Sequence, residues 1–303
     1  MQDTKLHLGI EVGDVLLKVA LFDPMEKKVL KTAVLDTGTS PLDDVPTFEN
    51  TLQGWLAGKD GVDLESVSVC VSSFRSLVRE VFVPPEAAAT MDNYLRWYLG
   101  LNVDAEENAY YFDSQILSGD AKAGYNVLLI AMRRVWVDAV RKGFRNKAIA
   151  PKIMEIDALS LLNLLETGYG FSSDMRCIIK ADVAGVLLMW VADKDIRAIR
   201  CCSTLEIVGK ARETAYAQLA KSIDDQIKLA FGANGVAASE YLLCGELASD
   251  VLFVESLRSS LSEQPLRLMD SFTNIRLPVA EEDASHVLSC AGAIGVALRG
   301  GKE

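Results

Sequence analysis

Residues 10–19 read IEVGDVLLKV: a β-strand, an acidic residue, a turn of small residues and a second strand. Residues 181–190, ADVAGVLLMW, repeat this order, and in an ungapped comparison Glu11 falls on Asp182. Each segment is followed by a third strand-like run. Apolar strands resemble one another by chance, which is the alternative explanation. An acidic residue before a tight turn, opening a three-strand meander in both halves, favours an internal duplication.

The rest of the chain mixes strand and helix patterns. Residues 67–74 and 126–132 are rich in β-branched and apolar residues, which is typical of buried strands. Apolar residues recur with helical spacing over 43–58, 86–101, 136–145, 158–165, 207–230, 248–260 and 289–298. A Gly- and Ser-containing stretch over 168–173 is the best candidate for a hinge between two halves. These patterns predict an α/β fold of two related units.

Composition and charge exclude several classes of protein. Half of the 303 residues are hydrophobic, and 31 basic against 42 acidic residues give a net charge of −11. This hydrophobic content argues against intrinsic disorder, and the acidic balance argues against nucleic-acid binding. The strongest apolar run, 183–192, is too short to span a bilayer. Residues 1–14 show no apolar signal region, and the six cysteines show no C-x-x-C spacing. We therefore expect a soluble cytoplasmic protein with free thiols.

Several blocks in the same order along the chain carry a family resemblance. They include LGIEVGDVLLKVALFD near the start, NVLLIAMRRVWVDAVRKGF in the middle and AGAIGVALRG near the end. Together they resemble the PilM family of type IV pilus assembly proteins, relatives of the cell-division protein FtsA. The resemblance implies an actin-like (ribonuclease H-like) α/β fold of two lobes, 1–170 and 171–303. It also implies an FtsA/PilM-type inserted subdomain at about 79–145 and a C-terminal helix, about 289–299, that packs back on the first lobe.

The resemblance also implies a function. Proteins of this family are scaffolds of the inner-membrane assembly platform of a type IV pilus, and a related cytoplasmic domain serves type II secretion. They are cytoplasmic and are held at the inner membrane by a partner. That partner is a PilN-like membrane protein, whose short N-terminal cytoplasmic peptide binds in a groove between the first lobe and the insert. Contacts with other platform proteins and a homo-oligomer stay open. The alternative is an ATP-binding protein of the same superfold, either a kinase-like enzyme or a filament-forming ATPase.

The first phosphate turn of the family usually reads Asp-Ile-Gly-Ser-Ser, with a Lys five residues after the Gly. Glu11, Gly13 and Lys18 keep the acid, the glycine and the lysine of this pattern. Asp14 stands where the family has a serine that donates to phosphate, and Val15 removes a second hydroxyl. An ionised carboxylate only accepts hydrogen bonds and repels a phosphate. The turn is therefore poorly suited to a nucleotide.

The second and third nucleotide loops also depart from the family pattern. The second usually reads Asp-Ile-Gly; here Asp182 keeps the acid, Ala184 replaces the glycine, and Gly185 can serve with the turn shifted by one. The adenosine loop usually carries Gly-Gly, whereas here Gly245 is followed by Glu246. Three altered loops predict weakened or lost binding of ATP and Mg²⁺, and favour a protein that is not an enzyme. No residue pattern indicates a catalytic group or a metal site.

The helix expected over 86–101 supplies the candidate partner-binding residues. Tyr94 and Tyr98 recur at helical spacing, whereas Trp97 lies off that stripe. A stripe facing a small core is one interpretation of this pattern. The other follows from the resemblance, which places this helix in the insert, so that Tyr94, Trp97 and Tyr98 line the partner groove.

Overall fold

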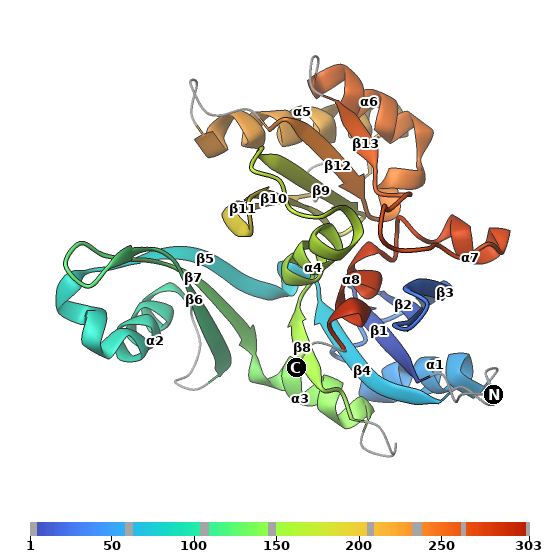
Figure 1. The fold of residues 1–303 in the computed structure, drawn as a ribbon, viewed down its shortest axis with the longest axis horizontal. Coiled ribbons are helices and arrows are strands. Elements are labelled where there is room, and N and C mark those ends of the chain that lie inside the picture. The colour runs from blue at the N-terminus through green and yellow to red at the C-terminus, as the bar shows by residue number, and fades with distance from the viewer. Residues whose placement is uncertain are drawn as a thin grey trace.

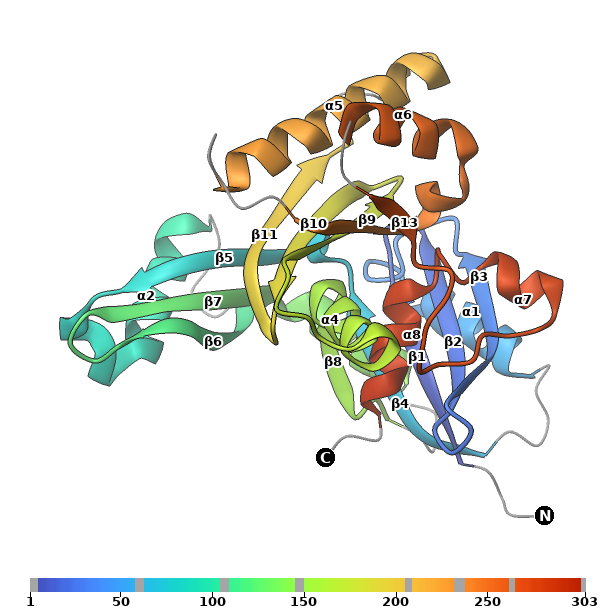
Figure 2. The ribbon, with the colours of Figure 1, turned by 45° about the horizontal axis from the view of Figure 1, so that its top comes forward.

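The computed structural model describes residues 5–57, 63–103, 109–144, 150–204, 209–231, 238–261 and 265–300. Two five-stranded sheets and one three-stranded sheet organise the chain (Figure 1). Helices α4 (Asp157–Tyr169) and α8 (Ala291–Arg299) pack against each other between the two larger sheets (Figures 1 and 2). Among the described helices, none combines the length and the apolar character that crossing a bilayer requires.

The first sheet begins as an antiparallel meander and continues with two parallel strands. In spatial order its strands are β3 (Lys28–Asp36), β2 (Leu16–Asp23), β1 (Leu6–Val12), β4 (Leu64–Val71) and β8 (Ile153–Ile156). Every residue of β1 is buried, as expected of a strand covered on both faces. Such a strand places any charged residue that it carries inside the protein.

The second sheet has the same order and the same strand directions. Its strands are β11 (Asp195–Ser203), β10 (Gly185–Ala192), β9 (Arg176–Asp182), β12 (Glu240–Cys244) and β13 (Leu266–Leu268). Helices α5 (Arg212–Phe231) and α6 (Val251–Leu261) lie together over one face (Figure 1). This repetition of topology supports the duplication that the sequence indicated.

The register of the two hairpins corrects the sequence comparison. Glu11 faces Lys18 across the first hairpin, and Lys180 faces Leu187 across the second. The hydrogen bond from Gly13 N–H to the carbonyl of Leu16 matches the pairing of Asp182 with Gly185. The registers therefore coincide when Glu11 is placed on Lys180, and the match with Asp182 was wrong by two residues. A shift of two keeps every side chain on its face of the sheet, which is why the apolar pattern concealed it.

The third sheet forms the inserted subdomain, which projects from the first sheet (Figure 1). It contains β5 (Ser76–Val83), β7 (Gly124–Arg133) and β6 (Tyr110–Asp120), with β7 in the centre. Helix α2 (Met91–Asn102) packs on one face over a small apolar core. Helix α3 (Arg134–Gly143), which follows, contacts α1 (Val45–Ala57) beside the first sheet. The domain limits predicted from the sequence stay a prediction.

Small residues let α8 approach the first sheet closely. A Cβ on Gly9 of β1 would lie 2.0 Å from the carbonyl oxygen of Ala293, and one on Gly295 would lie 2.0 Å from that of Ser160. A Cβ on Gly292 would lie 2.3 Å from Oε2 of Glu11. Neither backbone nor carboxylate has room to give way, so the Gly/Ala-rich sequence of α8 is a packing requirement. It brings the helix against the buried acid of β1.

Candidate functional site

Charged side chains from both lobes meet where the two hairpins face each other, and we call this group the interlobe cluster. Its members are Glu11, Lys18, Asp157, Lys180, Asp182 and Glu246. All are buried except Glu246, whose side chain is 20% exposed. Ionised groups enter a protein interior only when they are paired, so their mutual contacts decide what this region can do.

Lys18 of β2 reaches from the first lobe into the second. Its Nζ lies 2.9 Å from Oε1 of Glu246 and 3.0 Å from Oδ1 of Asp182. The third contact, at 3.3 Å, is with Oε1 of Glu11 on the neighbouring strand. Its contacts with Asp182 and Glu11 are hydrogen bonds, and Glu246 adds a third ion pair to the same ammonium group.

Lys180 of β9 makes the reciprocal connection from the second lobe to the first. Its Nζ lies 2.7 Å from Oε1 of Glu11 and 2.7 Å from Oδ2 of Asp157, both in the first lobe. Within its own lobe it lies 2.6 Å from Oδ2 of Asp182. Asp157 opens α4, and its Oδ1 accepts hydrogen bonds from the backbone N–H and the hydroxyl of Ser73. Each lobe thus gives one lysine to the acids of the other.

The electrostatics keep both lysines charged. Burial acts to lower the pKa of Lys18, but the carboxylates of Asp182 and Glu11 outweigh it and hold the pKa above its ordinary value. The pKa of Lys180 is raised in the same way, with Asp157 as the largest contributor among the acids. Burial acts to raise the pKa of Asp182, yet Lys18 and Lys180 hold it below its usual range. The cluster is therefore a set of mutually supported ions.

Glu246 closes the second turn from outside. Its Oε2 accepts a hydrogen bond of 3.0 Å from the backbone N–H of Val183, and its own N–H donates to Oδ1 of Asp182 at 3.0 Å. Gly245 has φ +95°, and a Cβ there would lie 2.5 Å from the carbonyl oxygen of Ala181. Glycine is therefore required before Glu246. The backbone N–H of Val183 in this turn is therefore bound by a carboxylate of the chain itself.

In the first turn, residues 13–15, the side-chain contacts differ from those of the second turn. Asp14, half exposed, forms an ion pair with Arg75 from the edge of the insert and stays outside the cluster. Gly13 closes the hairpin through its backbone. Oε2 of Glu11 is buried and has no hydrogen-bond partner among the described residues. A Cβ on Gly185 would collide with the ring of Phe74, so packing against this ring requires a glycine here.

The six nucleotide-site residues predicted from the sequence thus occupy two adjoining hairpins and the loop after β12. Lys18 contacts both Glu11 and Asp182, whereas Gly13, Gly185 and Gly245 shape the backbone. Sequence reasoning missed Asp157 and Lys180. The signal for Lys180 was available, because it is the single charge inside the apolar run CIIKA. In the part of the chain that the structure describes, no group of His, Cys, Asp and Glu is arranged to hold a metal.

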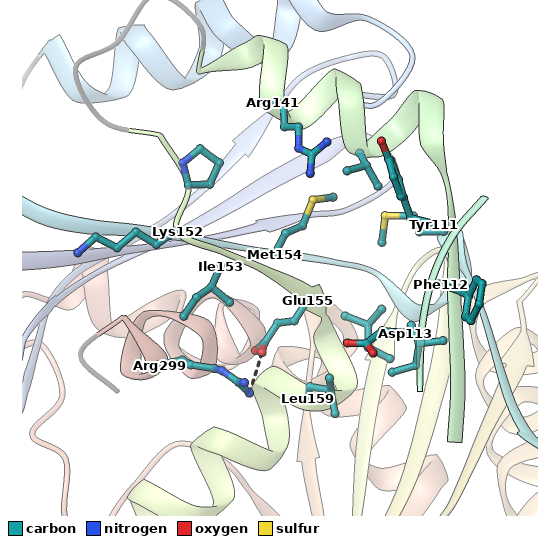
Figure 3. A pocket seen from close by; sticks show the side chains of 15 residues that line it. Tyr111, Phe112, Asp113, Arg141, Lys152, Ile153, Met154, Glu155, Leu159 and Arg299 are labelled. Atoms are coloured by element: carbon teal, nitrogen blue, oxygen red, sulfur yellow. Dashed lines mark ion pairs between the residues drawn. The ribbon is translucent and has the colours of Figure 1, made fainter. Parts of the chain in front are cut away.

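A second candidate site is a groove of about 500 Å³ between the inserted sheet and the first lobe (Figure 3). We call it the β6–β8 groove, because residues 111–113 of β6 and 153–156 of β8 line it from opposite sides. Its apolar lining consists of Ile130, Met132, Val137, Ile153, Met154, Ile156 and Leu159 together with the rings of Tyr111 and Phe112. Asp113, Arg141, Lys152, Glu155 and Arg299 add charge. Glu155 and Arg299 pair at 3.3 Å, as Figure 3 marks.

Both strands that face this groove are edge strands. β6 ends the order of the inserted sheet, and β8 ends the order of the first sheet. Along its outer side an edge strand carries backbone N–H and C=O groups that its own sheet leaves unpaired. The groove therefore combines an apolar lining with two rows of backbone donors and acceptors.

The aromatic residues predicted to bind a partner lie elsewhere on the insert. Tyr94 and Tyr98 pack on the small core beneath α2. Trp97 is 57% exposed and contacts Tyr94, with ring centroids 5.4 Å apart. None of the three lines the β6–β8 groove. Their role in partner binding stays a prediction.

Comparison with known proteins finds relatives in structure alone. No family model matches the chain, and no curated protein matches it. A solved structure of a PilM–PilN type IV pilus biogenesis complex is similar over 98% of this chain and 99% of that one, with a TM-score of 0.75 and 14% identity. The cytoplasmic domain of EpsL, an inner-membrane component of the type II secretion system of Vibrio cholerae, is similar over 93% of both chains, with a TM-score of 0.51 and 11% identity.

A protein of unknown function from Bacteroides thetaiotaomicron, described as having an actin-like ATPase fold, is similar at a TM-score of 0.52. The identity is 11% over 89% of this chain and 92% of that one. At these identities the likeness concerns the fold. The chain has the actin-like two-lobe α/β fold, and the prediction of its fold class is confirmed.

Proposed function

We propose that this protein is an actin-fold scaffold of a pilus or secretion platform, and that the β6–β8 groove binds the N-terminal peptide of a PilN-like inner-membrane protein. The observation that carries the proposal is the pair of edge strands facing one apolar groove. An extended peptide laid there can add to either sheet edge through its backbone. Its alternate side chains then enter the apolar lining.

The structural likenesses support this choice of partner. The most extensive likeness reported above is to PilM in complex with PilN, and EpsL is a component of an inner-membrane machine. A scaffold of this kind works in the cytoplasm and is held at the membrane by its partner. The partner peptide then supplies the attachment.

The interlobe cluster supports a second part of the proposal, namely that nucleotide is not required. Binding ATP with Mg²⁺ needs backbone donors for phosphate and acids free to hold the hydrated metal. Here the Val183 N–H is bound to Glu246, and Asp182 is bound to both lysines. Kinase-like and ATPase functions need both, so the cluster argues against an enzyme. The two lysines join the lobes where a nucleotide otherwise would.

A peptide titration tests the proposal. A fluorescent N-terminal cytoplasmic peptide of a PilN-like inner-membrane protein from the same organism should bind the purified protein with micromolar affinity. Met154→Asp places a charge among the apolar residues of the groove and should weaken binding at least tenfold. Trp97→Ala, on α2, is the matched control and should leave the affinity within twofold.

Two results would contradict this proposal. Absence of binding to the wild-type protein would remove the peptide as partner. Loss of binding in Trp97→Ala but not in Met154→Asp would move the partner site to the aromatic residues of α2.

A further inference from the structure

Two arginines flank the same short segment of the edge strand β6. Tyr111 and Phe112 are neighbours in β6, so their side chains point to opposite faces of the inserted sheet. The guanidinium carbon of Arg134 lies 4.3 Å from the centroid of the Tyr111 ring, and that of Arg96 lies 5.1 Å from the centroid of Phe112. Cation–π contacts of this kind orient a guanidinium without using all of its donors.

Neither arginine forms an ion pair with a carboxylate of the described residues. Arg134 donates from Nε to the carbonyl oxygen of Tyr110 at 3.3 Å, which leaves its terminal nitrogens available. Arg96 comes from α2 on the other face. Most other arginines of this acidic chain, such as Arg75, Arg176 and Arg276, have carboxylate partners. Within the described part of the chain, these two oriented guanidiniums beside one strand edge have no carboxylate partner, so they can bind acidic groups of a ligand.

Around these two arginines, basic side chains outnumber acidic ones, in contrast to the chain as a whole. A hollow of about 260 Å³, lined by both arginines and by residues 110–114, adjoins the β6–β8 groove and shares Tyr111, Phe112 and Asp113 with it. Together the two depressions contain five basic side chains, Arg96, Arg134, Arg141, Lys152 and Arg299, and three acidic ones, Asp92, Asp113 and Glu155. The whole chain, by contrast, carries a net charge of −11. An acidic ligand is therefore directed to this edge.

We infer that the segment docked beside β6 carries carboxylates at two successive positions, one bound by Arg96 and the next by Arg134. The inference rests on the proposed peptide-binding function of the groove and specifies the chemistry of its partner. A strand added to the edge of β6 continues the pleat, so its successive side chains point to opposite faces. One falls on the face of Phe112 and Arg96, and the next on the face of Tyr111 and Arg134.

This geometry favours an acidic peptide over an anionic lipid surface. A membrane presents its charges on one side of a protein, whereas Arg96 and Arg134 lie on opposite faces of a sheet. An extended peptide reaches both faces at once. Arginine can also bind a carboxylate through two parallel N–H···O bonds, which gives directional recognition.

The test uses terminally blocked, fluorescent nine-residue peptides with an alternating Val/Thr sequence, in which a pair of residues is moved along the chain. At each place along the peptide, the pair is made in four versions: Gln-Gln, Glu-Gln, Gln-Glu and Glu-Glu. At the preferred position we expect Glu-Glu to bind about tenfold or more tightly than Gln-Gln, and the gain to shrink as NaCl is raised.

The decisive measurement is which of the two successive glutamates loses its affinity gain in each arginine variant. Arg96→Gln should erase the gain from one glutamate of the pair, and Arg134→Gln the gain from the other. Arg258→Gln, an exposed arginine of α6, is the matched control and should change neither. Merely structural arginines would weaken all four peptides alike.

Three outcomes would overturn the inference. Equal binding of Glu-Glu and Gln-Gln peptides would show that the edge does not select carboxylates, while the groove itself stands. Failure of every designed peptide to bind would overturn it as well, and the titration with the natural N-terminal peptide then decides separately on the proposed function. Binding to phosphatidylglycerol vesicles that both variants abolish, without any acidic-peptide preference, would assign the arginines to lipid.

Discussion

The interlobe cluster and the β6–β8 groove are both polar regions between parts of the fold, yet they differ in what they leave unpaired. In the cluster, Lys18 and Lys180 each contact three carboxylates, and even the N–H of Val183 is taken. In the groove, β6 and β8 each end the strand order of their sheet, and beside it Arg96 and Arg134 have no carboxylate partner among the described residues. The charged groups of the cluster are paired with one another, whereas the groove retains hydrogen-bonding groups that can bind a partner.

This difference indicates how an actin-like fold can change its use. Nucleotide in this architecture occupies the cleft between the two hairpins, where its phosphates bridge the lobes. Here Lys18 and Lys180 join the lobes through their ion pairs, and we propose that the cleft contributes to stability instead of ligand binding. The insert, which the second lobe lacks, carries the surface with open hydrogen-bonding groups. The comparison predicts that changes in the cluster alter stability, whereas changes in the groove alter affinity for a partner.

The largest effect is expected from Lys180→Met. Methionine fills a similar volume but removes the cation that contacts Glu11, Asp157 and Asp182, and leaves these acids buried with one lysine. Breaking a buried ion pair from one side typically costs about 3–5 kcal/mol. We expect a loss of this size in the free energy of unfolding, measured by urea denaturation followed by circular dichroism.

The matched control is Lys152→Met, which removes an exposed lysine from the rim of the groove. Its unfolding free energy should change by less than about 0.5 kcal/mol, as is usual for exposed charges. Similar losses of unfolding free energy in both variants would contradict the expectation that the cluster, and not the groove, stabilises the fold. An unchanged stability in Lys180→Met would show that the cluster does not hold the lobes together.

Much of the fold could be predicted from short-range patterns. The repeated acid, tight turn and apolar strands of residues 10–19 and 181–190 indicated two equivalent sheets, because each meander is encoded within one continuous segment. The register could not be fixed in this way. Asp182 closes a turn where the first hairpin has Gly13, and only the pairing of strands shows that Lys180 is the true counterpart of Glu11.

The sites were harder to predict, since their members come together only in three dimensions. Lys18 was identified through its spacing from Gly13, but its contact with Asp182 joins residues 164 positions apart. Asp157 directly precedes the helix expected over 158–165, and no local pattern indicates its contact with Lys180. The groove depends on two edge strands from different sheets, and no local pattern shows which strand will end a sheet. The aromatic residues of α2 were predicted to bind a partner from their helical spacing and the family resemblance, whereas Tyr111 and Met154 carry no comparable local signal.

A smaller effect concerns pH. The pKa of Asp182 is held below its usual value of about 3.9, so its contribution to stability is present above that pH and is lost as the pH falls through the folded pKa. The pKa values of Lys18 and Lys180 are raised above about 10.4, so their contribution is complete below that pH and is lost as the pH rises through the folded values. The stabilisation from the cluster should therefore be constant from about pH 5 to 9. Urea denaturation of the wild-type protein at several pH values checks this: its unfolding free energy should not drift by more than about 1 kcal/mol over that range.

The smallest effect is expected where the sequence departs most visibly from a phosphate-binding turn. Asp14→Ser combined with Val15→Ser restores the two hydroxyls that the family pattern has at these positions. Asp14 is half exposed and paired with Arg75, outside the cluster, so replacing it leaves Glu246 on the Val183 N–H and both lysines on their acids. Calorimetric titration with Mg-ATP should then show no micromolar binding in either the double variant or the wild type. Micromolar affinity gained by the double variant would place the obstacle to nucleotide in the first turn, and the cluster would no longer account for the difference between cleft and groove.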